Sequence, residues 1–296
     1  MKLIAIVLGL VLEHLATHLL HLRDLRWFDR YYDFAIARLK RLSGWRVYAS
    51  VAAILAVLAV PVLLASYALQ GPGALWDPDY LAFALLVVFV SLGPRDLGEE
   101  VDEYCAAVDG NDLEAAQRVL VEMSEAARPR VGDIDLVEEA IFVQSVNRVF
   151  GVIFWFVALG PVGAWLFRIS DLLRRRAVFE TGRDADVGAV VLPAIEALYG
   201  ALKWIPARLT IVGFALSGNF DGALDGWRAH RRDPTAPIDV NNDRLTAQVG
   251  KAALTGVPAP PASAATIARR ALRLVTRTLF VWMTVLALMT IFGWAV

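Results

Sequence analysis

The sequence contains one long apolar stretch that a Gly-Pro pair interrupts near its middle. The stretch covers residues 144–168, and its uncharged part is rich in Phe and Trp. Gly160 and Pro161 break it, because proline lacks a backbone donor and clashes with the preceding helical turn. Non-helical backbone at membrane depth is tolerated only where protein or a cavity surrounds it. We therefore predict a broken, re-entrant membrane helix with a polar entrance at its start.

Other parts of the chain are also apolar enough for a membrane. Hydrophobic residues make up 57% of the 296 residues, and the mean hydropathy is +0.53, both high for a soluble protein. Further apolar runs of spanning or nearly spanning length cover 3–20, 47–69, 80–92 and 278–296. The sequence predicts an all-α polytopic membrane bundle with about four full spans, two broken or re-entrant segments and a cytoplasmic helical hairpin insertion.

The second broken segment is predicted at 187–218, where Trp204, Ile205 and Pro206 interrupt an apolar run. Two interrupted segments in one bundle point to a polar site between them. The residues expected to line this ligand pocket are Glu139, Gln144, Asn147, Trp155, Arg168, Arg208 and Thr210. Alternatively, the arginines serve only to pair with Glu196, Asp171 or lipid headgroups.

Two hydrophilic segments divide what we predict to be a single membrane domain over 1–296. In the first, 94–148, acidic residues outnumber arginines, and the pattern predicts two helices that a turn at 109–111 connects. Asp112 is the expected N-cap of the second of these. A third helix is expected to run without a break into the membrane. The second cytoplasmic segment covers 219–273, with a predicted turn at 239–243.

Charge flanking the apolar runs predicts the topology. The segment 22–46 is rich in arginine and aromatic residues, and four arginines precede the last apolar run. Positively charged loops tend to stay in the cytoplasm. We therefore expect both termini to face outward and the large loops to be cytoplasmic.

The first apolar run carries three ionisable residues, Glu13, His14 and His18. Ionisable groups at membrane depth are costly, so they should face the bundle interior. His14, His18 and His21 fall at i, i+4 and i+7, on one helical face, and this spacing can bind a metal. No acidic ligand shares that face, so we predict a polar stripe and no metal site.

Three segments resemble a known membrane family. They are GVIFWFVALGPVGAWLFR (151–168), GNDLEAAQR (110–118) and WIPARLT (204–210). They are similar to the CobD/CbiB family, which contains adenosylcobinamide-phosphate synthase. The closer resemblance is to its AmpE branch of inner-membrane regulatory proteins associated with β-lactamase induction. The resemblance implies a bacterial inner-membrane location.

The synthase branch joins an aminopropanol unit to a corrin side chain as an amide, using nucleotide and divalent metal. Its motif has a Glu-Asn pair and then Asp-Gly before the apolar run. Here Asn147 and Gly151 match, whereas Val146 and Phe150 stand in place of the two carboxylates. Asp171 and Arg174 stand where the family has Asn and Asp. Divalent metals need oxygen ligands, so the loss of these ligands argues against synthase activity. The resemblance itself implies the shared fold and a retained polar pocket.

The first function hypothesis is accordingly a regulatory or signalling protein linked to β-lactamase induction or cell-wall stress. It would need no cofactor, bind a small ligand such as a cell-wall fragment, and contact membrane lipid and a cytoplasmic or membrane protein partner. No nucleic-acid partner is expected. The alternative is an ATP- and Mg²⁺-dependent amide-forming cobalamin-pathway synthase, and the second alternative is a small transporter. Neither GxxxxGK[ST] nor GxGxxG occurs, so ordinary ATPase chemistry is not expected.

Overall fold

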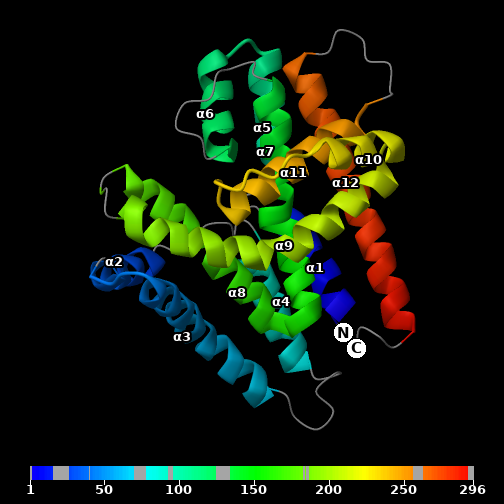
Figure 1. Ribbon diagram of the computed structural model, residues 1–296. Helices are drawn as coiled ribbons and strands as arrows, with labels where there is room; N and C mark the ends of the chain where they lie inside the picture. Colours follow the sequence, from blue (N-terminus) through cyan, green and yellow to red (C-terminus); the bar gives the residue numbers. More distant parts are fainter. Residues whose placement is uncertain are drawn as a thin grey trace.

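The protein, analysed as a computed structural model, is a bundle of helices (Figure 1). The structure describes residues 2–15, 27–39, 41–69, 78–92, 96–124, 134–182, 184, 187–255 and 263–292. The α-helices of this part are α1 (Lys2–Leu15), α2 (Trp27–Leu39), α3 (Trp45–Leu69), α4 (Pro78–Ser91), α5 (Leu97–Asp109), α6 (Leu113–Ser124), α7 (Ile134–Ser145), α8 (Gly151–Thr181), α9 (Leu192–Ser217), α10 (Phe220–Ala229), α11 (Ile238–Ala253) and α12 (Ala264–Ile291). Two π-helical turns, η3 (Val146–Phe150) and η4 (Val187–Val191), precede α8 and α9. No strand occurs in these ranges, which confirms the predicted all-α class.

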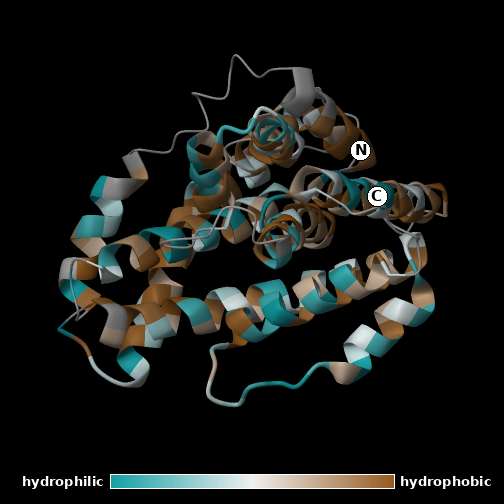
Figure 2. Ribbon diagram, turned by 90° about the horizontal axis from the view of Figure 1, so that it is seen from above, coloured by the Kyte–Doolittle hydropathy of each residue, from teal (hydrophilic) through white to brown (hydrophobic). Residues whose placement is uncertain are grey.

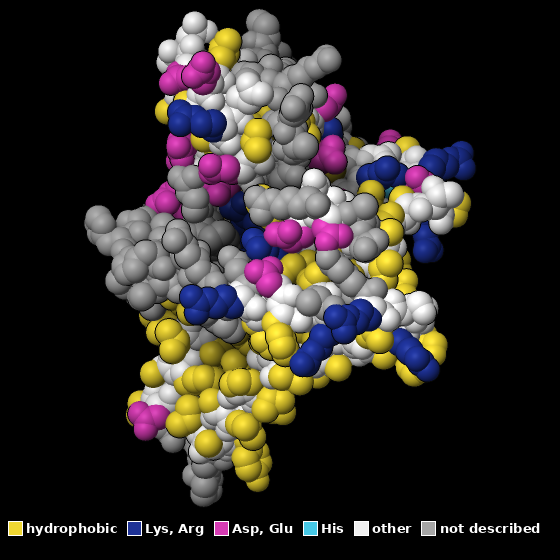
Figure 3. All heavy atoms as spheres, turned by 90° about the vertical axis from the view of Figure 1, so that its left-hand side faces the viewer, with side chains coloured by type: hydrophobic (Ala, Val, Ile, Leu, Met, Phe, Trp, Pro, Cys, Tyr) yellow, Lys and Arg dark blue, Asp and Glu magenta, His cyan; other side chains and the backbone are white. Residues whose placement is uncertain are grey.

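Four helical stretches are long and apolar enough to cross a membrane: Trp45–Leu69, Asp135–Thr181, Ala189–Ser217 and Ala264–Ile291. Their outward side chains are largely apolar, as Val57, Leu63 and Phe280 illustrate, each more than half exposed. Figure 2 shows hydrophobic residues along the long helices, and Figure 3 shows one face on whose lower part hydrophobic side chains predominate. Because an extensive apolar surface on helices of spanning length suits a bilayer, the chain is a membrane protein.

The central apolar stretch turns back on itself at Gly160. This glycine has φ 67° and ψ −154°, a backbone conformation that ends one helical arm and starts another. A Cβ atom added to Gly151 would lie 2.3 Å from the Phe167 ring, and one added to Gly163 would lie 2.2 Å from the Trp155 carbonyl oxygen. In a straight helix, positions 151 and 167 would be about 24 Å apart. The predicted break is confirmed, and the two arms of α8 form an antiparallel hairpin.

The second predicted break is wrong, because α9 runs through Trp204 and Pro206 without interruption. Proline inside a helix removes the hydrogen bond to the carbonyl four residues earlier. Here that carbonyl belongs to Leu202, and it accepts a hydrogen bond at 3.0 Å from the indole Nε1 of Trp155 on α8. A side chain from the hairpin therefore replaces the missing backbone donor, which helps to keep the helix intact.

The hydrophilic helices pack against the membrane helices as one body. Helices α5, α6 and α7 share a hydrophobic core with α11 and α12. The expected N-cap is confirmed, since Asp112 Oδ1 accepts a hydrogen bond from the Ala115 amide at 2.9 Å. Helix α7 continues through η3 into α8, as the sequence predicted. The predicted turn at 239–243 is wrong, because these residues form the start of α11.

The hairpin predicts a sharp difference between two glycine substitutions. Gly163→Ala should destabilise the protein by about 1–3 kcal/mol, because the methyl group would collide with the Trp155 backbone. Gly182→Ala is the matched control, since its added Cβ would meet nothing closer than 3.8 Å. Thermal unfolding of the detergent-purified variants measures the effect. Equal midpoints for the two variants would contradict the close-packed turn.

Candidate functional site

Four arginines gather where the two arms of the hairpin end. Arg148 lies 2.7 Å from Glu100 of α5, and both side chains are buried. Asp171 is completely buried, and three guanidinium groups surround its carboxylate. The distances are 3.2 Å for Arg168, 3.2 Å for Arg174 and 2.8 Å for Arg175. We call Arg148, Arg168, Arg174 and Arg175 with Glu100 and Asp171 the arginine cluster.

Two side-chain amides just before the hairpin, Gln144 of α7 and Asn147 of η3, connect this cluster. The Oε1 atom of Gln144 accepts hydrogen bonds from Arg148 Nε and Arg175 Nη2, each at 3.2 Å. Asn147 Oδ1 accepts a hydrogen bond at 2.8 Å from the Tyr199 hydroxyl of α9. Asn147 lies in the π-helical turn η3, a type of irregularity that is frequent at functional sites. Gln144 therefore links the start of the hairpin to its end, and Asn147 links the start to α9.

A second set of buried polar residues lies where α11 crosses α9. Gly200 permits the close approach, since a Cβ atom there would lie 2.5 Å from the Asp239 amide nitrogen. Asn242 Nδ2 donates to the Gly200 carbonyl at 2.9 Å. The buried ammonium of Lys203 pairs with Asp243. We call Lys203, Asp239, Asn242 and Asp243 the Lys203 group.

Asp239 is the most unusual carboxylate of the site. Its residue is only 3% exposed, and its Oδ1 atom has no hydrogen-bond partner among the described residues. Burial raises the pKa of Asp239 above its ordinary value; Lys203 opposes this shift and Asp243 adds to it. A buried oxygen without a partner is costly in a folded protein, so Asp239 is a candidate for contact with a ligand.

Tyr199 joins the arginine cluster to the Lys203 group. The Arg174 guanidinium carbon lies 5.1 Å from the centre of its ring, and the Lys203 ammonium lies 5.4 Å from the same centre. Both distances suit cation–π contacts. The site is thus one continuous buried polar network that runs from α5 through the hairpin and α9 to α11.

The structure brings together some of the predicted pocket residues. Gln144, Asn147 and Arg168 lie in or beside the arginine cluster. Arg208 Nη1 donates a hydrogen bond to Asn242 Oδ1 at the edge of the Lys203 group. Whether these residues bind a ligand stays a prediction.

The other predicted residues lie apart from this network. The polar atoms of Trp155 and Thr210 bond to the backbone carbonyls of Leu202 and Pro206. Glu139 is half-buried on α7. The Glu13 and His14 side chains and residue His18 lie outside the described residues.

Sequence reasoning missed Glu100, Tyr199 and Asp239. Glu100 lies in the acidic segment 94–148, where a solvent-exposed position is the usual one for a carboxylate, yet it is 3% exposed. Asp239 and Asp243 are four residues apart and so share a helical face. That spacing could have identified them, had the segment been recognised as a helix.

The arrangement can bind an anion. The arginine cluster has four guanidinium groups and two carboxylates, and it reaches the surface at Arg175, whose side chain is 22% exposed. Asp243 of the Lys203 group, 24% exposed, is also accessible. Arginine presents paired donors that match carboxylate and phosphate oxygens. Within the described ranges, no three His, Cys, Asp or Glu side chains gather closely enough to hold a metal ion.

Comparison with known proteins gives consistent matches to one family. The sequence model of the family described as CobD/Cbib protein matches residues 3–257. A cobalamin biosynthesis protein CobD of Stutzerimonas stutzeri is 30% identical over 188 residues, which cover 62% of this chain and 59% of the relative. The protein of the same name from Chromobacterium violaceum is 27% identical over 190 residues, 63% of this chain and 57% of the relative. The alignments thus span less than two thirds of these relatives. No solved structure matches.

The buried pair Arg148–Glu100 predicts that the stability losses of substitutions at its two residues are not additive. Arg148→Met or Glu100→Leu alone should cost about 3–5 kcal/mol, because each leaves a buried charge without its main partner. The double variant should regain most of that loss. Thermal unfolding in detergent measures each.

The exposed pair Arg269–Asp109 is the matched control. It has the same 2.7 Å separation, with side chains 46% and 50% exposed. Single changes there should cost less than about 1 kcal/mol. A double variant at Arg148 and Glu100 whose loss equals the sum of the single losses would contradict the coupling.

Proposed function

The chain belongs to the CobD/CbiB family, and from this premise we propose that it forms an amide bond in cobalamin biosynthesis. The observation that carries the proposal is the match over residues 3–257, which includes the whole arginine cluster and the Lys203 group. Two relatives that match are named as cobalamin biosynthesis proteins. The proposed reaction joins an aminopropanol unit to a carboxyl group on a corrin side chain.

The comparisons correct the regulatory function that the sequence first suggested. That hypothesis followed from the AmpE-type resemblance and from the two apolar residues at the motif's carboxylate positions. The matching relatives carry the name of a biosynthetic protein. Val146 and Phe150 are completely buried. The acidic groups of the site come instead from Glu100, Asp171 and the Lys203 group.

The arginine cluster is the proposed binding place for the acidic substrate. Amide formation starts from a carboxylate. A nucleoside triphosphate would transfer its γ-phosphoryl group to a carboxylate oxygen and leave as the diphosphate, and the amine would then displace inorganic phosphate from the acyl phosphate. The carboxylate and the acyl phosphate are both anions, and an excess of buried guanidinium groups stabilises them. Arg175 lies at the accessible edge of the cluster, so it would make the first contact.

Asp239 is the proposed acceptor for the proton that the attacking amine must lose. Its Oδ1 has no partner among the described residues, and a raised pKa makes a carboxylate a stronger base. Lys203 pairs with Asp243, which lies one helical turn after Asp239 on α11. The Lys203 ammonium would hold the substrate anion beside Asp239. In this proposal the arginine cluster and Lys203 bind the substrate, and Asp239 accepts the proton.

The described residues do not provide a dedicated magnesium site. Asp171 is already bonded by three arginines, and Asp243 pairs with Lys203. Mg²⁺ prefers several oxygen ligands in octahedral geometry. We therefore assign no step to a metal. The arginine cluster is the proposed binding place for the nucleotide phosphates.

An assay of membranes that contain the protein tests this function. Incubation with a corrin acid, aminopropanol and Mg·ATP should give the amide, identified by its mass. Asp239→Asn should lower kcat about 10²-fold with little change in KM, the size typical for loss of a general base. Asp225→Asn, an exposed position on α10, is the matched control. Absence of the amide with the wild-type protein, together with no growth of a synthase-deficient strain that carries it, would refute the proposal.

We further propose that both termini face outward and that the hydrophilic helices are cytoplasmic. The arginines of α12 precede its uncharged part, and positive residues favour the cytoplasmic side. In a Cys105→Ser background, Arg118→Cys should react with a membrane-impermeant thiol reagent only in opened cells. Phe292→Cys should react in intact cells. The reverse pattern would overturn this orientation.

A further inference from the structure

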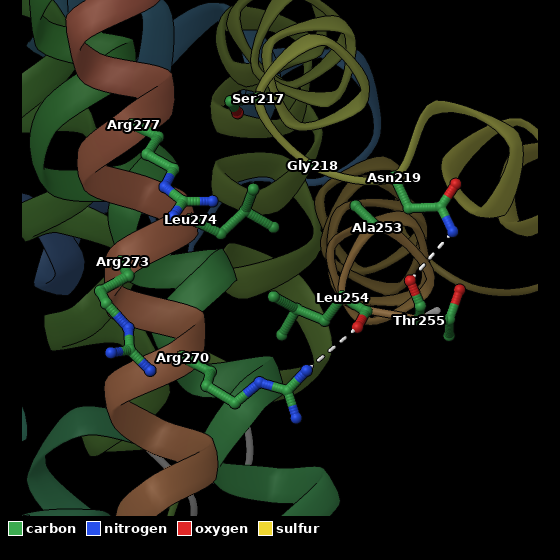
Figure 4. A pocket seen from close by; sticks show the side chains of 10 residues that line it. All are labelled: Ser217, Gly218, Asn219, Ala253, Leu254, Thr255, Arg270, Arg273, Leu274 and Arg277. Atoms are coloured by element: carbon green, nitrogen blue, oxygen red, sulfur yellow. Dashed lines mark hydrogen bonds between the residues drawn. The ribbon is translucent and has the colours of Figure 1, made fainter. Parts of the chain in front are cut away.

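A second site lies far along α9 from the Lys203 group. There, a cavity of about 460 Å³ opens between the end of α9, the end of α11 and the first half of α12 (Figure 4). Its lining residues are Ser217, Gly218, Asn219, Ala253, Leu254, Thr255, Arg270, Arg273, Leu274 and Arg277. Three of them are arginines of one helix, and the family match ends before that helix begins.

The three arginines occupy related positions of α12. Spacings of three and four residues place Arg270, Arg273 and Arg277 on one side of the helix. Arg270 donates to the Leu254 carbonyl at 3.5 Å, the long limit of a hydrogen bond. Arg273 and Arg277 are exposed and form no ion pair with a described carboxylate. By contrast, the neighbouring Arg269 pairs with Asp109 and does not line the cavity.

The cavity lies at the expected boundary between membrane and water. Arg277 is the last charged residue of α12, and the helix is uncharged from Thr278 to its end. A contact of 2.6 Å between the hydroxyls of Ser217 and Thr278 fixes α9 against α12 at this level. Arginines at such a boundary commonly face lipid phosphates.

An apolar groove lies on the membrane side of that contact. It is a cavity of about 320 Å³ between α8, α9 and α12. Its lining is apolar throughout: Phe154, Val157, Leu209, Val212, Gly213, Leu216, Val281, Trp282, Val285, Leu286 and Met289. Val212 and Val285 are 48% and 49% exposed, so the groove opens outward, where lipid chains lie.

We propose that these two cavities together bind one anionic phospholipid. The phosphate would lie among Arg270, Arg273 and Arg277, and one acyl chain would follow α9 and α12 into the groove. A soluble phosphate could use the arginines but not the groove, and a zwitterionic lipid could use the groove but would gain less from three positive charges. The pairing of a cationic cavity with an apolar one favours a lipid that has both parts.

Binding to the detergent-purified full chain tests the proposal. Native mass spectrometry would compare phosphatidylglycerol with phosphatidylcholine of the same acyl chains. We expect about 100-fold tighter binding of phosphatidylglycerol, because each arginine near an anionic lipid contributes about fivefold. The triple variant R270Q/R273Q/R277Q should lose this preference. The matched control R228Q/R231Q/R232Q changes three exposed arginines outside the cavity and should keep it.

A second variant tests the groove without touching the arginines. Val285→Trp should fill it and weaken binding of long-chain phosphatidylglycerol, while the weaker binding of a dihexanoyl phosphatidylglycerol should stay unchanged. Inorganic phosphate should not compete at millimolar concentration. Equal binding of the two lipid classes, full competition by phosphate alone, or an unchanged preference in the triple arginine variant would each overturn the proposal. Unfolding midpoints without lipid serve as the check that each variant folds.

Discussion

The buried carboxylate of Asp171 is the interaction on which the rest of this structure depends. Three guanidinium groups within 3.2 Å satisfy it, and all of them come from the returning arm of the hairpin. Charges of this kind are tolerated in an apolar bundle only when they are paired. Gln144 of α7, just before the hairpin, is a further acceptor for Arg175. The turn at Gly160 makes the two arms antiparallel and so brings the end of the hairpin beside its start. The pairing of the buried charges therefore depends on the backbone conformation of this glycine.

The site is shared by membrane helices and hydrophilic helices. Glu100 of α5 compensates Arg148, and α11 supplies Asp239, Asn242 and Asp243 to α9. Helices α5 and α11 are therefore structural parts of the polar network and not merely loops between spans. The order along the chain hides this, because Glu100 and Arg148 are 48 positions apart and become neighbours only when α7 folds back along α5.

What the sequence could predict was local. Gly160 and Pro161 predict a break, because the constraint acts on the backbone of those residues themselves. Pro206 carries the same constraint, yet α9 continues, since the indole of Trp155 satisfies the Leu202 carbonyl from another helix. The inference from Val146 and Phe150 against enzyme chemistry was local in the same way, because it considered only the residues of one segment. Sequence motifs show which carboxylates are absent from a segment, but they do not show which ones another helix brings into the same space.

Helix α9 connects the two sites, and this has a mechanical consequence. It carries Tyr199 and Lys203 in the buried network, and it carries Ser217 at the arginine-lined cavity. Gly213 lies so close to α12 that an added Cβ atom would be 2.5 Å from Thr278, so the two helices are in direct contact beside that cavity. Because α12 also packs against α5 and α7, a ligand that holds α12 against α9 would stabilise the same helices that position Glu100 and Lys203. Packing between α9 and α12 therefore contributes to the positions of the helices that carry the polar network.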